Sequence, residues 1–150
     1  MPGESDDSGP WGEMPLVVDN SAWSRADRPE IREDWNRALH ADRLRISPVA
    51  RLEILYSARS GTIFDDLTQE LSTLRAAPLT PSIIRAAEDA MRTLAHRSAG
   101  AQRLPLVDYL LAATAQHTSC AVLHYDRDFD TLAQIMDFDS IWLAPAGSIP

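Results

Sequence analysis

Four acidic residues occupy positions where a folded chain rarely leaves a charge unpaired. Asp19 and Asp126 follow short apolar runs that are typical of buried strands. Asp108 lies in a stretch that is otherwise Leu, Val, Tyr and Ala nearly all round, and Glu53 lies at the margin of an apolar helical stripe. Burial of a charge is unfavourable unless the charge is paired or bound to a metal. The four carboxylates are therefore candidates for a shared metal site.

The oxygen ligands indicate which metal and which chemistry such a site would support. Converging carboxylates repel one another and raise each other's pKa values, and a divalent cation relieves this repulsion. Mg²⁺ and Mn²⁺ prefer carboxylate and water ligands. Two such ions about 3.5–4 Å apart can activate a water and stabilise the leaving oxygen of a phosphodiester. One cysteine and four scattered histidines make a zinc site a poor alternative.

Each acid can also have a purely structural role. Asp19 can cap the helix that follows it, and Asp126 can cap a helix over 129–136. Glu53 can pair with an arginine. Asp108 falls in the first turn of its helix, where the dipole favours a negative charge by about 0.3–1 kcal/mol, although this does not explain why the helix is so apolar. On the local pattern alone, capping and metal binding are equally good interpretations of Asp19.

Short apolar strands alternate with amphipathic helices along the chain. This alternation predicts an α/β fold with a mostly parallel sheet, and α/β folds place their chemistry at the carboxyl ends of the strands. We therefore expect Asp19 and Asp126 at one edge of the sheet, with the helices that carry Glu53 and Asp108 over that edge. The expected strands lie near 16–18, 44–47, 121–124 and 139–143, and the expected helices over 22–26, 30–41, 48–59, 63–75, 81–97, 105–117 and 129–136.

Helical spacing also predicts which side chains face the core. Leu52 and Tyr56 share an apolar stripe with Glu53, and Ile63 and Ile84 belong to the apolar faces of the next two helices. An amphipathic helix buries its apolar stripe. We therefore expect these four apolar side chains to be buried.

Composition limits the class of protein. The 150 residues fit one domain, and the net charge of −8 gives no general attraction to nucleic acid or anionic membrane. The chain has no lysine, so its 14 basic residues are all arginines, which suit two-pronged contact with phosphate or carboxylate. No run approaches the ~20 apolar residues of a membrane span, and no secretory signal is recognisable, so we expect a cytoplasmic protein. We expect residues 1–14 to be a disordered tail or an extension before the natural start, 15–144 a single domain, and 145–150 a frayed tail.

Four segments of the chain resemble the motifs of one known family. In order, LVVDNSAW, RLEILYSAR, LPLVDYLLAATA and LHYDRDFDTLA look like the motifs of the PIN domain, in particular of the VapC-type toxins of type II toxin–antitoxin modules. The resemblance covers about residues 15–144. It implies a PIN-like three-layer α/β/α sandwich with a mostly parallel central sheet. It also implies a divalent-metal-dependent endoribonuclease that cleaves RNA phosphodiester bonds with metal-activated water.

The same resemblance implies a set of site residues and partners. It implies Mg²⁺ as cofactor, with Mn²⁺ as an alternative, an RNA substrate, a homodimer, and inhibition by a cognate VapB-like antitoxin. Because the chain is acidic, we expect bound metal and nearby arginines to offset its charge toward RNA. The residues that match the acidic quartet, as catalytic residues and metal ligands, are Asp19, Glu53, Asp108 and Asp126; the accessory candidates are Ser21 and Asp128; the candidate arginines are Arg25, Arg28, Arg97 and Arg103.

Two other functions are compatible with the same acids. A Mg²⁺-dependent phosphatase-like α/β domain also uses an aspartate at a strand end, but such domains commonly use a lysine, and this chain has none. A non-catalytic interaction module would use its acids only to cap helices and pair with arginines. Stable phosphoryl labelling of Asp19 would support the phosphatase. Failure of Mn²⁺ or Mg²⁺ to bind through Asp19 and Asp108 would support the interaction module.

Overall fold

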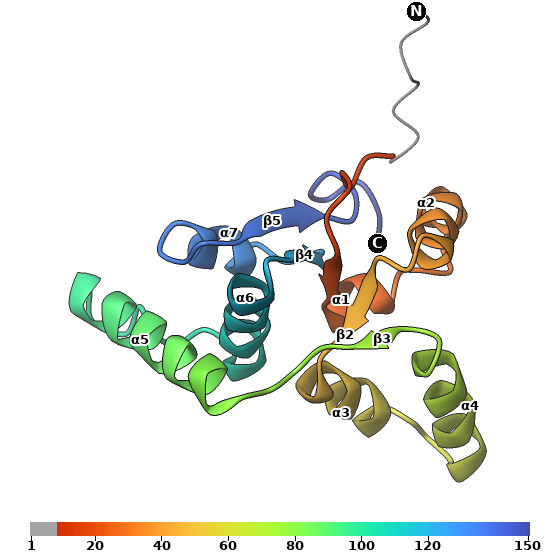
Figure 1. Ribbon diagram of the computed structural model, residues 1–150, viewed down its shortest axis with the longest axis horizontal. Coiled ribbons are helices and arrows are strands. Elements are labelled where there is room, and N and C mark those ends of the chain that lie inside the picture. Colours follow the sequence, from red (N-terminus) through yellow and green to blue (C-terminus); the bar gives the residue numbers. More distant parts are fainter. Residues whose placement is uncertain (1–8) are drawn as a thin grey trace, which may run out of the picture.

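A parallel five-stranded sheet forms the centre of the molecule. The structure, a computed structural model, describes residues 9–150 (Figure 1). The strand order is β3-β2-β1-β4-β5, and every neighbouring pair is parallel. The chain therefore builds one half of the sheet outward from β1 and then returns to build the other half from β4. The strands are β1 (Leu16–Val18), β2 (Leu44–Ile46), β3 (Arg75–Ala76), β4 (Ala121–His124) and β5 (Asp139–Trp142).

Within residues 9–150, seven helices surround this sheet, which gives the three-layer α/β/α sandwich that the sequence predicts. α6 packs against β1 and β4, and α5 packs on the outer side of α6 (Figure 1). α1 contacts β4 and α3, and α7 lies against α6 and β5. The helices are α1 (Asn20–Trp23), α2 (Pro29–His40), α3 (Pro48–Tyr56), α4 (Gly61–Leu71), α5 (Pro81–Arg97), α6 (Leu106–Thr118) and α7 (Asp128–Ala133). No helix of the described chain is both long and apolar enough to cross a membrane.

Side-chain caps explain where several helices begin. Asp19, Ser47, Ser60 and Thr80 each accept a hydrogen bond from a backbone N–H in the first turn of the helix that follows. Such caps satisfy N–H groups that have no partner inside the helix. At the other end of the helix that carries Asp108, Ser119 adopts a left-handed conformation with φ of 55°, which terminates α6.

Several elements differ from the sequence prediction: the expected helices over 22–26, 48–59 and 129–136 are α1, α3 and α7 with other bounds, and β3 and α4 differ further. β3 was not expected, because its two residues are exposed and form no apolar run. The helix expected over 63–75 begins earlier, at Gly61, with Ser60 as its cap, and it ends at Leu71. Because this helix ends at Leu71, the chain that follows is free to form β3.

The prediction of buried stripes was wrong for the four apolar side chains at 52, 56, 63 and 84. Leu52, Tyr56, Ile63 and Ile84 are exposed to 68%, 93%, 44% and 51%. The residues of α3 that face the core are instead Ala50, Ile54 and Leu55. Apolar residues lie nearly all round α3, so spacing alone could not identify the face that packs on α4 and α6.

Both ends of the described chain are packed against the domain. Residues 1–8 of the expected tail lie outside the described residues, but Trp11 is only 2% exposed and its Nε1 donates to the carbonyl of Leu143 at 3.1 Å. Ile149 is buried in the segment that was expected to fray, and its N–H donates to the hydroxyl of Tyr125 at 3.1 Å. An apolar side chain within a polar stretch therefore anchors each end.

Candidate active site

The carboxyl ends of β1 and β4 bring two of the acids to one edge of the sheet. These strands are neighbours, with Val18 opposite Leu123, and the N–H of Asp19 donates to the carbonyl of Leu123 at 3.0 Å. Asp126 follows the end of β4 by two residues. The two halves of the sheet diverge between β1 and β4, and α/β folds place ligands at such a switch point.

Ser21 connects the segments that follow these two strands. Asp19 Oδ2 accepts hydrogen bonds from the N–H of Ser21 at 3.0 Å and from its hydroxyl at 2.5 Å. The same hydroxyl accepts the N–H of Tyr125 at 2.9 Å. Asp19 therefore does cap α1, and the contact that caps the helix also fixes this carboxylate beside the backbone that leads to Asp126.

Asp108 is the most perturbed acid of the site. It is 5% exposed in the first turn of α6, and within residues 9–150 its Oδ2 has no hydrogen-bond partner. Burial raises the pKa of Asp108 to about 8, with further upward contributions from Asp19, Asp126, Asp128 and Glu53. A buried carboxylate oxygen without a donor, surrounded by other acids, is a place where a cation fits.

Asp128 joins Asp108 and Asp126 in the tightest group of acids. One carboxylate oxygen from each of the three lies within 4.8 Å of the other two. The N–H of Asp128 donates to Asp126 Oδ1 at 3.0 Å, which places both carboxylates at the start of α7. Burial and the charge of Asp126 raise the pKa of Asp128, while a hydrogen bond with Asp108 lowers it. This group of three oxygen donors could hold a metal ion.

Asp19 and Glu53 lie beside this group and interact with it through their charges. Burial raises the pKa of Asp19, and the charge of Asp126 adds to that increase. Burial and the charge of Asp19 raise the pKa of half-buried Glu53, which a hydrogen bond from the side chain of Asn20 lowers. Among residues 9–150, Glu53 forms no ion pair with an arginine. The sequence analysis did not identify Asn20, because nothing in the local pattern indicates a contact between this residue and Glu53.

Of the four candidate arginines, Arg25 contacts residues of the site. Its Nη1 donates to the carbonyl of Ser21 at 2.7 Å, its Nε donates to the carbonyl of Pro150 at 3.0 Å, and its guanidinium lies 4.6 Å from the ring centre of Tyr125. Arg28 is the residue before α2 and is half-buried. Arg97 ends α5 and Arg103 precedes α6, and both are exposed.

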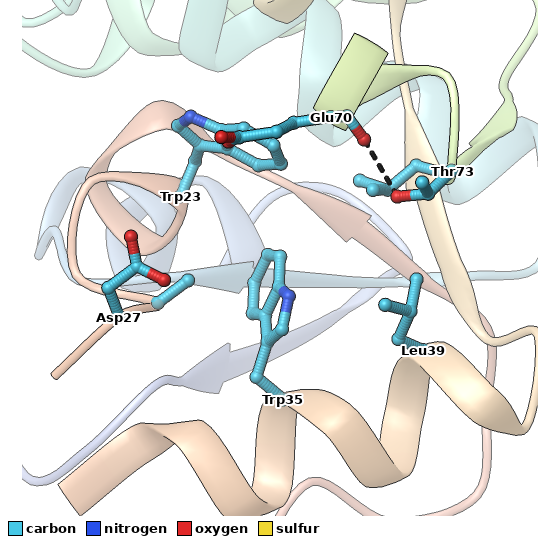
Figure 2. A pocket seen from close by; sticks show the side chains of 8 residues that line it. Trp23, Asp27, Trp35, Leu39, Glu70 and Thr73 are labelled. Carbon is cyan, nitrogen blue, oxygen red and sulfur yellow. Dashed lines mark hydrogen bonds between the residues drawn. The ribbon is translucent and has the colours of Figure 1, made fainter. Parts of the chain in front are cut away.

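A hollow between α1, α2 and α4 is separate from the acidic edge. Figure 2 shows Trp23 and Trp35 in this hollow of about 210 Å³, where their rings meet edge to face at 6.0 Å. Its two carboxylates, Asp27 and Glu70, are exposed, and Thr73 donates to the backbone carbonyl of Glu70 at 2.7 Å. The five acids of the candidate site do not line this hollow; they are Asp19, Glu53, Asp108, Asp126 and Asp128.

Comparison with known proteins decides the family. The model of the PIN domain matches residues 16–135. The chain is 38% identical over 137 residues to ribonuclease VapC18 of Mycobacterium tuberculosis, an alignment that covers 91% of this chain and 100% of the relative. This chain belongs to the PIN-domain family, among its VapC ribonucleases. Ribonuclease VapC51 of the same organism is 34% identical over 91% of this chain and 98% of its own length.

Solved structures confirm the PIN fold independently. DNA-bound VapBC from Salmonella typhimurium has a chain that superposes with a TM-score of 0.69 at 16% identity, over 88% of this chain and 100% of that chain. VapBC-5 from Mycobacterium tuberculosis has a chain with a TM-score of 0.58 at 20% identity, over 84% of this chain and 98% of that chain. The match of the PIN-domain model and the similarity to the two VapC relatives confirm the family that the four sequence motifs predicted.

Proposed function

We propose that this protein is the toxin of a type II toxin–antitoxin module and acts as a divalent-metal-dependent endoribonuclease. The observation that carries the metal-dependent activity is the buried carboxylate of Asp108, which has an unpartnered oxygen and lies close to Asp126 and Asp128. The relatives named ribonuclease VapC, similar over nine tenths of the chain, support RNA as the substrate. We assign residues 15–144 to the catalytic PIN domain and place the protein in the cytoplasm, where RNA would be available to it.

The acids have separate roles in this proposal. Asp108, Asp126 and Asp128 hold a divalent cation, and the charges of Asp19 and Glu53 favour binding of that ion or of a second one beside it. Ser21 keeps the carboxylate of Asp19 directed into the site. All of these donors are oxygens, so we propose Mg²⁺ as the cofactor, with Mn²⁺ as a substitute. Such an ion supplies an activated water and stabilises negative charge on the phosphate that is cleaved.

The protonation of Asp108 links metal binding to pH. With a pKa of about 8, the metal-free carboxyl keeps its proton at neutral pH. A carboxyl must lose its proton to act as a metal ligand. The proton of Asp108 is therefore displaced when a cation enters, and below pH 8 protons and cations compete for this side chain.

RNA must approach a protein whose net charge is −8. The cation offsets the charge of the acids at the centre of the site. Arg25 stands at its border, where the carbonyl of Ser21 and the ring of Tyr125 hold the guanidinium. We propose that Arg25 contacts a phosphate of the RNA, because a guanidinium binds phosphate through two parallel N–H groups.

A VapB-like antitoxin and a second copy of this chain are the proposed protein partners. Solved structures with this fold include chains of VapBC complexes, and an acidic toxin suits a basic segment of an antitoxin. The exposed side chains of Leu52 and Tyr56 on α3 support a homodimer, because large apolar groups on a surface mark protein contacts. Light scattering on the purified chain tests the dimer directly.

The decisive experiment is cleavage of total bacterial RNA by the purified, antitoxin-free chain, with Mg²⁺ or Mn²⁺ and with EDTA. We expect discrete fragments that require metal and that disappear in Asp108→Asn and in Asp19→Asn. Asp66→Asn changes an exposed acid on α4 in the same way and serves as the matched control. Cleavage that survives EDTA, or that persists in Asp108→Asn, would contradict the proposed mechanism, and no cleavage by folded, metal-bound protein would contradict the nuclease itself.

A further inference from the structure

A buried histidine, His124, contacts the acidic group formed by Asp108, Asp126 and Asp128 through the backbone of Asp126. His124 ends β4, and its side chain is fully buried. Its ring stacks on Phe129, with 4.9 Å between ring centres, and meets the edge of Trp142 at 5.0 Å. Aromatic groups on two sides restrict rotation of the ring, so its two nitrogens point in fixed directions.

The hydrogen bonds of the ring determine which nitrogen carries the proton. Nδ1 accepts the backbone N–H of Asp126 at 3.1 Å, and Nε2 lies 2.6 Å from the hydroxyl oxygen of Ser140. A backbone N–H can only donate, so Nδ1 is unprotonated and Nε2–H donates to Ser140.

The hydrogen bonds of His124 belong to one continuous series that ends on the carboxylate of Asp130. Ser140 donates its own hydroxyl proton to Asp130 Oδ1 at 2.8 Å, and Trp142 Nε1 donates to Asp130 Oδ2 at 2.9 Å. The order is therefore Asp126 N–H, His124, Ser140 and Asp130. Each group in this order donates to the next. The whole series of hydrogen bonds therefore depends on His124, whose Nδ1 accepts and whose Nε2 donates.

This series of hydrogen bonds fixes the backbone of Asp126, an acid that the proposed function places in the metal site. Asp126 is held by its N–H through His124, and its Oδ1 accepts the N–H of Asp128. The like charges of the acidic group push these carboxylates apart when no cation is present. A rigid support behind the backbone opposes that separation, as hydrogen-bonded partners behind metal ligands do in other metal sites.

We propose that His124 is a positioning residue that fixes the Asp126 backbone, and thereby sets the affinity of the acidic group for a divalent cation. The proposal rests on the proposed function, since it assigns His124 to the same metal site. In this proposal the two nitrogens of the His124 ring have different functions. Nδ1 positions the metal-binding acid, whereas Nε2 ties β4 to β5 through Ser140.

Two amide substitutions separate these functions. His124→Asn places an amide near the position of Nδ1, where its oxygen can accept the N–H of Asp126. His124→Gln places its amide near the position of Nε2 and loses that acceptor. Both variants remove the aromatic ring, so the loss of ring packing is common to them and cancels in the comparison.

The measurement is calorimetric titration of each purified full-length protein with Mn²⁺. We expect His124→Gln to bind Mn²⁺ at least tenfold more weakly than His124→Asn, in line with the 10–100-fold effect of partners behind metal ligands. We also expect high Mn²⁺ concentrations to restore RNA cleavage by His124→Gln. Equal affinities in the two variants, or the reverse order, would overturn the positioning role. If wild type itself bound no Mn²⁺, the proposed function would fail instead.

A second measurement needs no variant and applies even if both substitutions impair folding. In ¹⁵N NMR of the metal-free wild type, we expect an unprotonated Nδ1 with a coupling across the hydrogen bond to the amide of Asp126. During titration with Mg²⁺, the resonances of Nδ1 and of this amide should shift at the same metal concentration. A protonated Nδ1, or an Nδ1 resonance that Mg²⁺ does not move, would contradict the proposal.

Discussion

The substitution Asp108→Asn should make the metal-free protein more stable while it removes activity. Asparagine keeps the shape of the side chain but carries no charge to bury, and its NH₂ group can donate to the acids around it. Residues arranged for function often lower stability, and their replacement then raises it. Asp108, with its buried and unpartnered Oδ2, is the clearest such case among residues 9–150.

The size of the effect follows from the pKa of Asp108. This pKa rises from 3.8 to about 8 on folding, so between these values the folded state holds a proton that the unfolded state has lost. The stability that the group contributes is fully present below pH 3.8 and is lost as the pH rises toward 8. At 1.36 kcal/mol per pKa unit, the loss is about 4 kcal/mol at pH 7 and roughly 5–6 kcal/mol above pH 8. Incomplete hydrogen bonding of the new amide offsets about 1–3 kcal/mol, which leaves a net gain of about 2–5 kcal/mol at pH 8.

Urea unfolding in EDTA, followed by circular dichroism at pH 4.5 and at pH 8, tests this reasoning. We expect Asp108→Asn to exceed wild type in free energy of unfolding at pH 8, and we expect the two proteins to converge at pH 4.5. Asp66→Asn, an exposed acid on α4, should show no such pH-dependent difference. Asp108→Asn that is no more stable than wild type at pH 8 would refute the argument that Asp108 is buried at an energetic cost.

Three further predictions follow from individual contacts. Ser21→Ala removes the hydroxyl between Asp19 and the N–H of Tyr125. It should lower the free energy of unfolding in urea by about 1–2 kcal/mol and weaken Mn²⁺ binding in calorimetry. The control Ser24→Ala should change neither quantity. Trp11→Ala should cost about 3–5 kcal/mol in the same urea assay, because this indole is fully packed in the core. The apparent Mg²⁺ affinity of wild type should rise by up to about tenfold per pH unit from 6 to 8 and then level off, as the proton on Asp108 ceases to compete; a flat calorimetric profile would contradict this.

The central part of the fold and the acids at its edge could be predicted from the sequence because their signals are local. β1 is a short, wholly apolar run, β4 is apolar up to His124, and an acid follows each of them closely. Parallel strands end at the same edge of a sheet, so the meeting of Asp19 and Asp126 followed from the alternation of strands and helices. The family motifs were needed for Glu53 and Asp108, because a position on a helix does not by itself distinguish a metal ligand from an ion-paired acid or one that stabilises the first turn.

The rest depends on contacts between residues far apart in the chain. β3 forms because its backbone finds β2, and its two exposed residues give no pattern to recognise. The position of Asp128 in the tightest acidic group depends on how α7 meets α6. His124 finds its partner in Ser140 on the neighbouring strand, a contact that no spacing around the histidine could indicate.

The perturbed acids and the fold around them explain why metal binding and stability should be coupled in this protein. Without a cation, Asp108 avoids burying a charge only by keeping a proton. A bound cation replaces that proton and also neutralises the acids around it, so a ligand that binds the folded state alone stabilises that state by mass action. In the function that we propose, Ser21, which holds Asp19, and His124, which holds Asp126, then have a common physical purpose. They hold like charges close together before the cation arrives, so that less of its binding energy is lost to assembling the site.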